Sequence, residues 1–151
     1  MRITLFCFSL LAGAGTALAQ SPAPARQPTP QDYAQRNQQI EQAALQVAEL
    51  VDQGREAQIW DGSSLITKQL ISRDAFVQNL SADRKAVGTV VNRNFGTLSF
   101  SQSDGKKLPP GLFANVAFAT HFANEKQTVR ELVSFHLDND NVWRVTGYTL
   151  R

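Results

Sequence analysis

Two histidines and one carboxylate are the side chains in this sequence that could do chemistry. His121 and His136 are its only histidines, so a histidine-bound metal or a histidine acid–base catalyst must use them. Each lies in a run that alternates apolar and polar side chains, which predicts a β-strand. With the apolar faces of the two strands aligned, the histidines lie about 20 Å apart, at about 3.3 Å per residue. A shared zinc ion needs both nitrogens about 2 Å away, so we expect neither a metal site nor a cofactor.

The sequence carries no recognisable catalytic motif. The nucleophile pattern G-x-S-x-G and the phosphate-binding patterns G-x-x-x-x-G-K and G-x-G-x-x-G are absent. Asp138 and Asp140 flank Asn139, but the rest of a calcium-loop spacing is missing, so a hairpin turn explains them better. We therefore predict no catalytic residues and a protein that is not an enzyme. The competing enzymatic hypothesis uses Glu131 or His121.

The elements that position these side chains are predicted to be helices first and strands second. Apolar side chains recur every three or four positions in the first part, which predicts helices at residues 31–51, 55–62, 65–71 and 72–91. Alternation with a period of two then predicts strands at residues 95–100, 112–122, 129–137 and 142–150. This order is typical of an α+β fold, with N-terminal helices packed on a four-stranded curved antiparallel sheet.

Aligning the apolar faces of the last three strands gives a register. Phe122 then lies opposite Val129, and the inner face ends in a polar trio of Thr120, Glu131 and Thr149. A carboxylate beside an apolar floor is costly unless it is hydrated or hydrogen-bonded, so it can mark a site. We predict a ligand pocket lined by Thr120, Glu131, Trp143, Gly147 and Thr149. In the alternative interpretation, Glu131 lies in water at the strand end or pairs with a helix residue such as an arginine.

The predicted outer face of the sheet carries a small apolar cluster among polar side chains. Its members are Leu132, Tyr148 and Leu150. Such a cluster is a reasonable protein-contact surface. The cluster is equally compatible with a cover formed by the N-terminal segment or by a second copy in a homodimer.

The first thirty residues are predicted to lie outside the folded domain. A basic residue, an apolar run and the Ala17–Ala19 cleavage pattern predict a signal peptide over residues 1–19. A proline- and alanine-rich tether follows at residues 20–30, and residues 31–151 form a single α+β domain. We expect a periplasmic or secreted protein without stable membrane insertion after cleavage. The basic residues are scattered, so no nucleic-acid partner is expected.

The C-terminal V-W-R-V-T-G-Y at residues 142–148 resembles the W-R-V-x-G-Y ending of an exported bacterial family, domain of unknown function 4019. Residues 50–54 with Trp60, residues 86–93, and residues 108–111 followed by 118–124 resemble its upstream segments. The resemblance covers residues 43–151 and implies a small exported domain similar to nuclear-transport-factor-like or cystatin-like folds. It implies no catalytic residues.

Two hypotheses for function follow. The first is a non-catalytic periplasmic binding protein that acts by protein–protein contact, such as an inhibitor or immunity-type protein against an envelope-acting toxin. The second is a small-ligand-binding domain that uses the concave face of the sheet.

Overall fold

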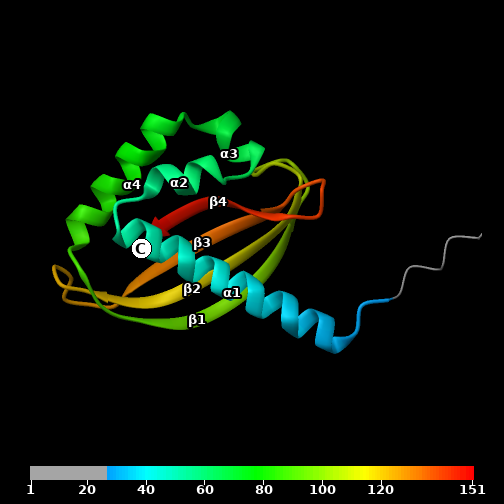
Figure 1. Cartoon of the computed structure of the whole chain (residues 1–151), viewed down its shortest axis with the longest axis horizontal. Helices are drawn as coiled ribbons and strands as arrows, with labels where there is room; N and C mark the ends of the chain where they lie inside the picture. Colours follow the sequence, from blue (N-terminus) through cyan, green and yellow to red (C-terminus); the bar gives the residue numbers. More distant parts are fainter. Residues whose placement is uncertain (1–26) are drawn as a thin grey trace, which may run out of the picture.

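The structure, a computed structural model, describes residues 27–151. The predicted signal peptide and residues 20–26 of the predicted tether lie outside the described residues. Within them, four helices precede four strands, as predicted (Figure 1). The helices are α1 (Pro30–Asp52), α2 (Glu56–Asp61), α3 (Leu65–Leu70) and α4 (Arg73–Val87). The strands are β1 (Val90–Ser103), β2 (Gly111–Phe122), β3 (Val129–Leu137) and β4 (Trp143–Leu150).

α1 begins one residue inside the predicted tether. Thr29 is its N-cap: the Thr29 hydroxyl accepts a hydrogen bond from the Asp32 N–H, and the Asp32 carboxylate accepts one from the Thr29 N–H at 2.6 Å. Pro30 occupies the first helical turn, where its missing N–H has no intrahelical role. The predicted apolar stripe is buried, through Ile40, Ala44, Val47, Ala48 and Val51. Burial of this stripe therefore fixes which side of α1 faces the sheet.

The boundary between α4 and β1 differs from the prediction. The sequence predicted a helix to residue 91, but α4 ends at Val87 because Gly88 has a positive φ of 79°. The Arg84 guanidinium donates a hydrogen bond to the freed Gly88 carbonyl. β1 consequently starts at Val90 and runs for 14 residues, much longer than the predicted strand at 95–100.

The sheet is an antiparallel meander with strand order β1-β2-β3-β4. The predicted pairing of β2 with β3 is displaced by two residues, because Thr120 rather than Phe122 lies opposite Val129. Phe122 pairs instead with Val90 of β1, and the following residues continue that contact through the Ala123 N–H to the Thr89 carbonyl. A shift of two keeps every side chain on its predicted face.

The pairing of β3 with β4 contains a bulge that the sequence analysis missed. Phe135 lies opposite Val145 as predicted, but Ser134 lies opposite Gly147, so Thr146 is an extra residue in β4. A bulge exchanges the faces of all residues beyond it. Tyr148 and Leu150 therefore lie on the inner face and Gly147 and Thr149 on the outer face, the reverse of the prediction.

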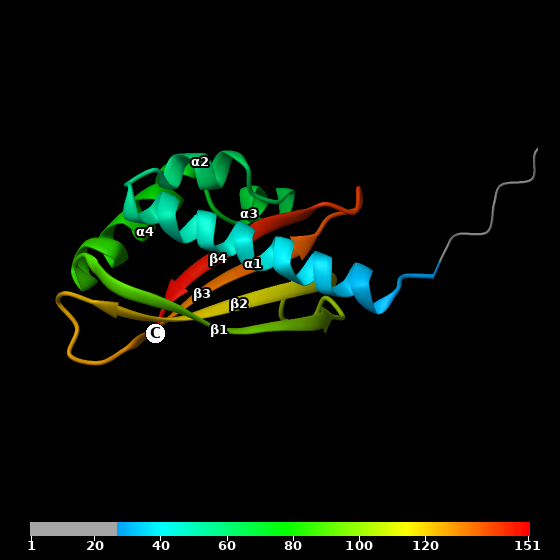
Figure 2. The ribbon, with the colours of Figure 1, turned by 60° about the horizontal axis from the view of Figure 1, so that its bottom comes forward.

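All four helices lie on one face of the curved sheet (Figures 1 and 2). The core is formed between them by α1, Ile59 of α2, Phe76 and Leu80 of α4, and the inner-face side chains of the strands. On the outer face, Phe113 and His136 are also buried. Their rings make an edge contact at 4.9 Å beside the Pro109–Pro110 corner.

Gly111 provides a test of this outer-face packing. Its φ is 138°, and a Cβ atom there would overlap the His136 ring. We expect Gly111→Ala to lower the free energy of unfolding by about 1–3 kcal/mol, as measured by urea denaturation, because the new Cβ overpacks the site and the backbone holds a φ that favours glycine. Gly147→Ala is the matched control, because a Cβ there meets no atom within 4 Å. Equal stabilities of the two variants would contradict the assigned packing.

Candidate functional site

Glu131, the centre of the predicted pocket, is fully buried within a hydrogen-bonded network. The Thr120 hydroxyl donates to Glu131 Oε2 at 2.6 Å, and the Tyr148 hydroxyl donates to Oε1 at 2.5 Å. The Arg93 guanidinium donates through Nε to Oε2 at 2.5 Å and through Nη2 to Oε1 at 2.9 Å. These four hydrogen bonds occupy the roughly four acceptor positions of a carboxylate. Glu131 therefore has no lone pair left for a ligand.

The network continues from Arg93 to the molecular surface. Arg93 also donates to Asp52 at the end of α1, at 2.9 and 3.1 Å. Asp52 in turn accepts from Arg84 of α4 at 3.0 and 3.1 Å. Acidic and basic groups thus alternate from Glu131 to Arg84, and each buried charge has a partner of opposite sign. Such pairing is what a buried charge requires.

The network shifts the pKa values of two of its members. Burial alone would lower the pKa of the Arg93 guanidinium, but its hydrogen bonds to Asp52 and Glu131 raise that pKa above the ordinary value. Burial and the adjacent Glu131 charge both raise the pKa of Tyr148 well above its ordinary value of 10.0. Arg93 is therefore a permanent cation and Tyr148 a neutral hydrogen-bond donor.

The structure brings together only part of the predicted pocket. Thr120 and Glu131 are in contact, whereas Trp143 lies at the other end of the inner face, and Gly147 and Thr149 lie on the outer face. The predicted contact cluster is divided in the same way. Leu132 stays on the outer face, while Tyr148 is buried and Leu150 packs against the core.

Sequence reasoning missed Arg93 and Tyr148 as partners of Glu131, and Asp52 as the second partner of Arg93. The alternative of an arginine partner was raised, but for a helix residue, and Arg93 lies in β1. A signal for all three was present in the sequence. Asp52, Arg93 and Tyr148 all lie in segments that resemble the family motifs.

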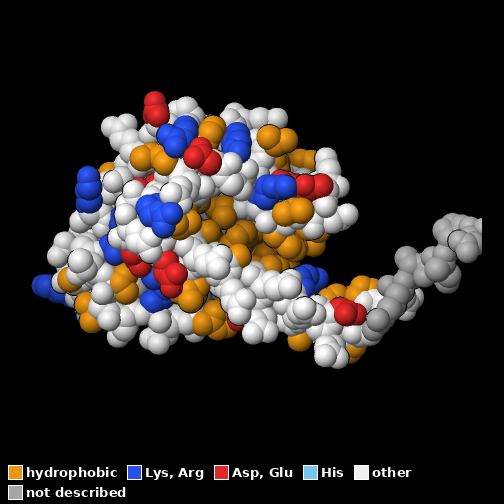
Figure 3. Space-filling view, in the orientation of Figure 1, with side chains coloured by type: hydrophobic (Ala, Val, Ile, Leu, Met, Phe, Trp, Pro, Cys, Tyr) orange, Lys and Arg blue, Asp and Glu red, His pale blue; other side chains and the backbone are white. Residues whose placement is uncertain are grey.

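The other half of the concave face is open. Figure 3 shows hydrophobic side chains at the floor of a hollow over the sheet, between α1 and the α2–α3 segment. The Phe100 and Trp143 rings come from the two edge strands and lie 5.9 Å apart. The partly exposed apolar side chains of the inner face at this end are Leu98, Phe100, Leu112, Leu137 and Trp143. We call this region the open half of the concave face.

Arg36 of α1 borders the open half. Its guanidinium carbon lies 4.6 Å from the centre of the Phe100 ring and 5.1 Å from that of Tyr33. Within residues 27–151, Arg36 donates to the Asn37 side chain but has no carboxylate within 4.0 Å. The preceding 26 residues contain no aspartate or glutamate. The Arg36 charge is therefore not paired with any carboxylate side chain of this chain.

A separate cleft of about 820 Å³ lies between α3 and the β3–β4 hairpin. At its wall, Asp138 accepts hydrogen bonds from Ser64 at 2.6 Å, from His136 at 2.8 Å and from Arg144 at 3.1 Å. Burial would raise the pKa of Asp138, but these hydrogen bonds lower it below the ordinary value. Arg144 also lowers the pKa of Asp140 to about 2. The charged groups at this wall of the cleft are therefore already paired with one another.

Neither a metal-binding cluster nor a membrane-spanning helix occurs within residues 27–151. Between residues 27 and 151, no group of three or more histidine, cysteine, aspartate or glutamate side chains could hold a metal ion. His121 pairs with Asn92 and His136 with Phe113, at opposite ends of β2. In the same part of the chain, no helix has the length and apolar character needed to cross a membrane.

Comparison with known proteins assigns the chain to a family. The family model described as "Protein of unknown function (DUF4019)" matches residues 43–148. The chain belongs to this family. The DUF4019 match spans the region from α1 to β4 and includes Asp52, Arg93, Glu131 and Tyr148. Searches of curated proteins and of solved structures gave no match.

Removal of the Glu131 carboxylate tests the network. Glu131→Ala leaves Arg93 with one carboxylate and two buried hydroxyls without their acceptor, so we expect a loss of about 3–5 kcal/mol in the free energy of unfolding. Urea denaturation monitored by tryptophan fluorescence measures this loss. Glu49→Ala is the control, because Glu49 is exposed on α1. A Glu131→Ala protein as stable as the control would contradict the assigned network.

The raised pKa of Tyr148 predicts a loss of stability at alkaline pH. A folded-state pKa above the unfolded-state value gives stability that is complete below pH about 10 and is lost as pH rises further. In a Tyr33→Phe variant, Tyr148 is the only remaining tyrosine. Its phenolate absorbance should rise only together with unfolding. Reversible ionisation near the ordinary value of 10.0 in the folded protein would show that Tyr148 is not buried against Glu131.

Proposed function

We propose that this protein is a non-catalytic binding protein of the cell envelope that holds a small amphiphilic anion in the open half of its concave face. The observation that carries the proposal is the juxtaposition of partly exposed aromatic side chains with Arg36, whose charge has no carboxylate partner. Ligand sites typically combine an apolar lining with a few fixed polar groups. An apolar body would lie on Phe100 and Trp143, and a carboxylate would lie beside Arg36.

The division of the concave face supports a ligand at this position. The half around Glu131 is filled by its own hydrogen-bonded network and has no free acceptor. Within residues 27–151, the apolar side chains of the open half remain partly exposed. Covering such a surface is favourable by about 25 cal/mol for each Å² removed from water. The ligand pocket that the sequence predicted around Glu131 is therefore proposed to lie at the Trp143 end of the concave face.

We further propose that the fold is of the nuclear-transport-factor-like or cystatin-like type. A long helix lying across the concave face of a curved antiparallel sheet supports this assignment (Figure 2). Periplasmic or secreted localisation is part of the proposal and rests on the signal-peptide pattern of residues 1–19.

Recognition of an envelope-acting toxin is a second proposal. The contact surface predicted for it, formed by Leu132, Tyr148 and Leu150, is not present as one patch on the outer face. Of the three residues expected to form the contact patch, Tyr148 is 8% exposed and hydrogen-bonded to Glu131. Leu132 alone remains on the outer face. The geometry therefore favours the ligand proposal over protein contact through this patch.

Binding of decanoate tests the ligand proposal. In a Trp60→Phe variant, Trp143 is the only tryptophan, so its fluorescence reports the open half directly. We expect decanoate to change this emission saturably, and 1-decanol, which lacks the carboxylate, to bind less tightly. In the same background, Arg36→Gln should weaken decanoate binding about tenfold, equivalent to about 1.4 kcal/mol.

Arg130→Gln is the matched control, because Arg130 is exposed on the outer face. It should leave the decanoate titration unchanged. Circular dichroism should show that all three variants remain folded. No response to decanoate, or equal affinities of the Arg36→Gln and control proteins, would contradict the proposal.

A further inference from the structure

Arg36 contains a buried polar atom that its own chain does not satisfy. Within residues 27–151, its Nε is the only buried side-chain nitrogen or oxygen without a hydrogen-bond partner. A guanidinium has five N–H donors. Arg36 uses one of them in this part of the chain, from Nη2 to Asn37 Oδ1 at 3.1 Å. Buried donors are nearly always paired, so this exception indicates a group that a ligand can satisfy.

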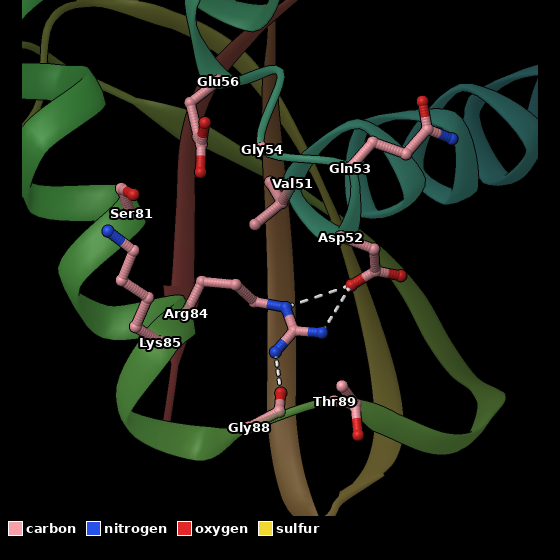
Figure 4. A pocket seen from close by; sticks show the side chains of 10 residues that line it. All are labelled: Val51, Asp52, Gln53, Gly54, Glu56, Ser81, Arg84, Lys85, Gly88 and Thr89. Carbon is pink, nitrogen blue, oxygen red and sulfur yellow. Dashed lines mark hydrogen bonds and ion pairs between the residues drawn. The ribbon is translucent and has the colours of Figure 1, made fainter.

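Partly buried arginines elsewhere in the described residues are paired with carboxylates. Arg84 donates to Asp52 at 3.0 and 3.1 Å (Figure 4). Arg93 and Arg144 also form ion pairs with acidic side chains. Arg36 differs from them, because its side-chain partner is the neutral amide oxygen of the next residue. Its positive charge is therefore left uncompensated.

The neutrality of Asn37 is what leaves this charge available. A guanidinium can only donate hydrogen bonds, so the amide oxygen of Asn37, and not its nitrogen, must face Nη2. An aspartate at this position would accept the same hydrogen bond and would neutralise the charge. The guanidinium carbon lies over the rings of Phe100 and Tyr33, at 4.6 and 5.1 Å from their centres. A charge beside apolar groups interacts more strongly with an opposite charge than it does in bulk water.

We propose that Asn37 determines the ligand specificity of the open half by acting through Arg36. Its amide oxygen holds Nη2 and adds no negative charge, so the other N–H groups and the full positive charge remain for a ligand carboxylate. The ligand class is an apolar molecule with one anionic head. A neutral analogue keeps the apolar contact but loses the ion pair. This inference rests on the proposed function, because it concerns the same site.

Asn37→Asp tests this role in the Trp60→Phe background, where Trp143 fluorescence reports binding. We expect its affinity for decanoate to fall about tenfold, to the level of 1-decanol, and its affinity for 1-decanol to stay unchanged. Asn37→Ala removes the hydrogen bond but adds no charge, so it should still bind decanoate more tightly than 1-decanol. The ratio of the two affinities is the readout, because a purely structural defect would weaken both ligands alike.

Gln38→Glu is the matched control, because Gln38 is exposed on α1 and the substitution adds the same charge one residue further along. It should keep the preference for decanoate. The inference is overturned if Asn37→Asp is as selective as this control. It is also overturned if Asn37→Ala loses selectivity as fully as Asn37→Asp, since the hydrogen bond rather than neutrality would then be decisive.

The background protein distinguishes this inference from the proposed function. If it does not bind decanoate, both are overturned. If it binds decanoate with Arg36-dependent affinity while Asn37→Asp has no effect on selectivity, the proposed function stands and the role of Asn37 alone is overturned.

Discussion

The ion pair between Arg93 and Glu131 is the interaction on which the rest of the structure depends. The network around it takes one side chain from each strand: Arg93 from β1, Thr120 from β2, Glu131 from β3 and Tyr148 from β4. Asp52 and Arg84 extend it to α1 and α4. Removing two charges from water costs several kcal/mol for each ion, so the pair is tolerable only because the remaining hydrogen-bonding groups are satisfied. Its geometry consequently ties the sheet and two helices together.

This network also determines where a ligand can bind. It closes one half of the concave face, since every acceptor of Glu131 is occupied. The other half has no comparable network and retains partly exposed aromatic rings beside Arg36. At the surface end of the network, Asp52 and Arg84 pair with each other. The half around Glu131 is therefore structural, whereas the open half beside Arg36 is available for binding.

A single extra residue in β4 decides which side chains take part. The bulge at Thr146 turns Tyr148 toward Glu131 and turns Gly147 and Thr149 away. Without the bulge, Thr149 would face inward, as strict alternation predicts, and a buried tyrosine would be lost from the core. The phenol contributes both apolar area and a donor to the carboxylate, which a threonine offers only in part. The bulge therefore accounts for both errors of face in the predicted pocket and contact cluster.

The sequence by itself determined the elements and their order, because helical and strand periodicities are local properties of the chain. It predicted α1 to within a residue or two, the bounds of β3, the α+β class and the family, and it identified Glu131 as a carboxylate on an apolar face. Only the tertiary structure decided the partners of Glu131. They depend on Gly88 ending α4 early enough for Arg93 to enter β1, and on the bulge at Thr146. The partners lie 11 to 38 residues from Glu131 along the chain in this network, and their meeting depends on packing that no local pattern records.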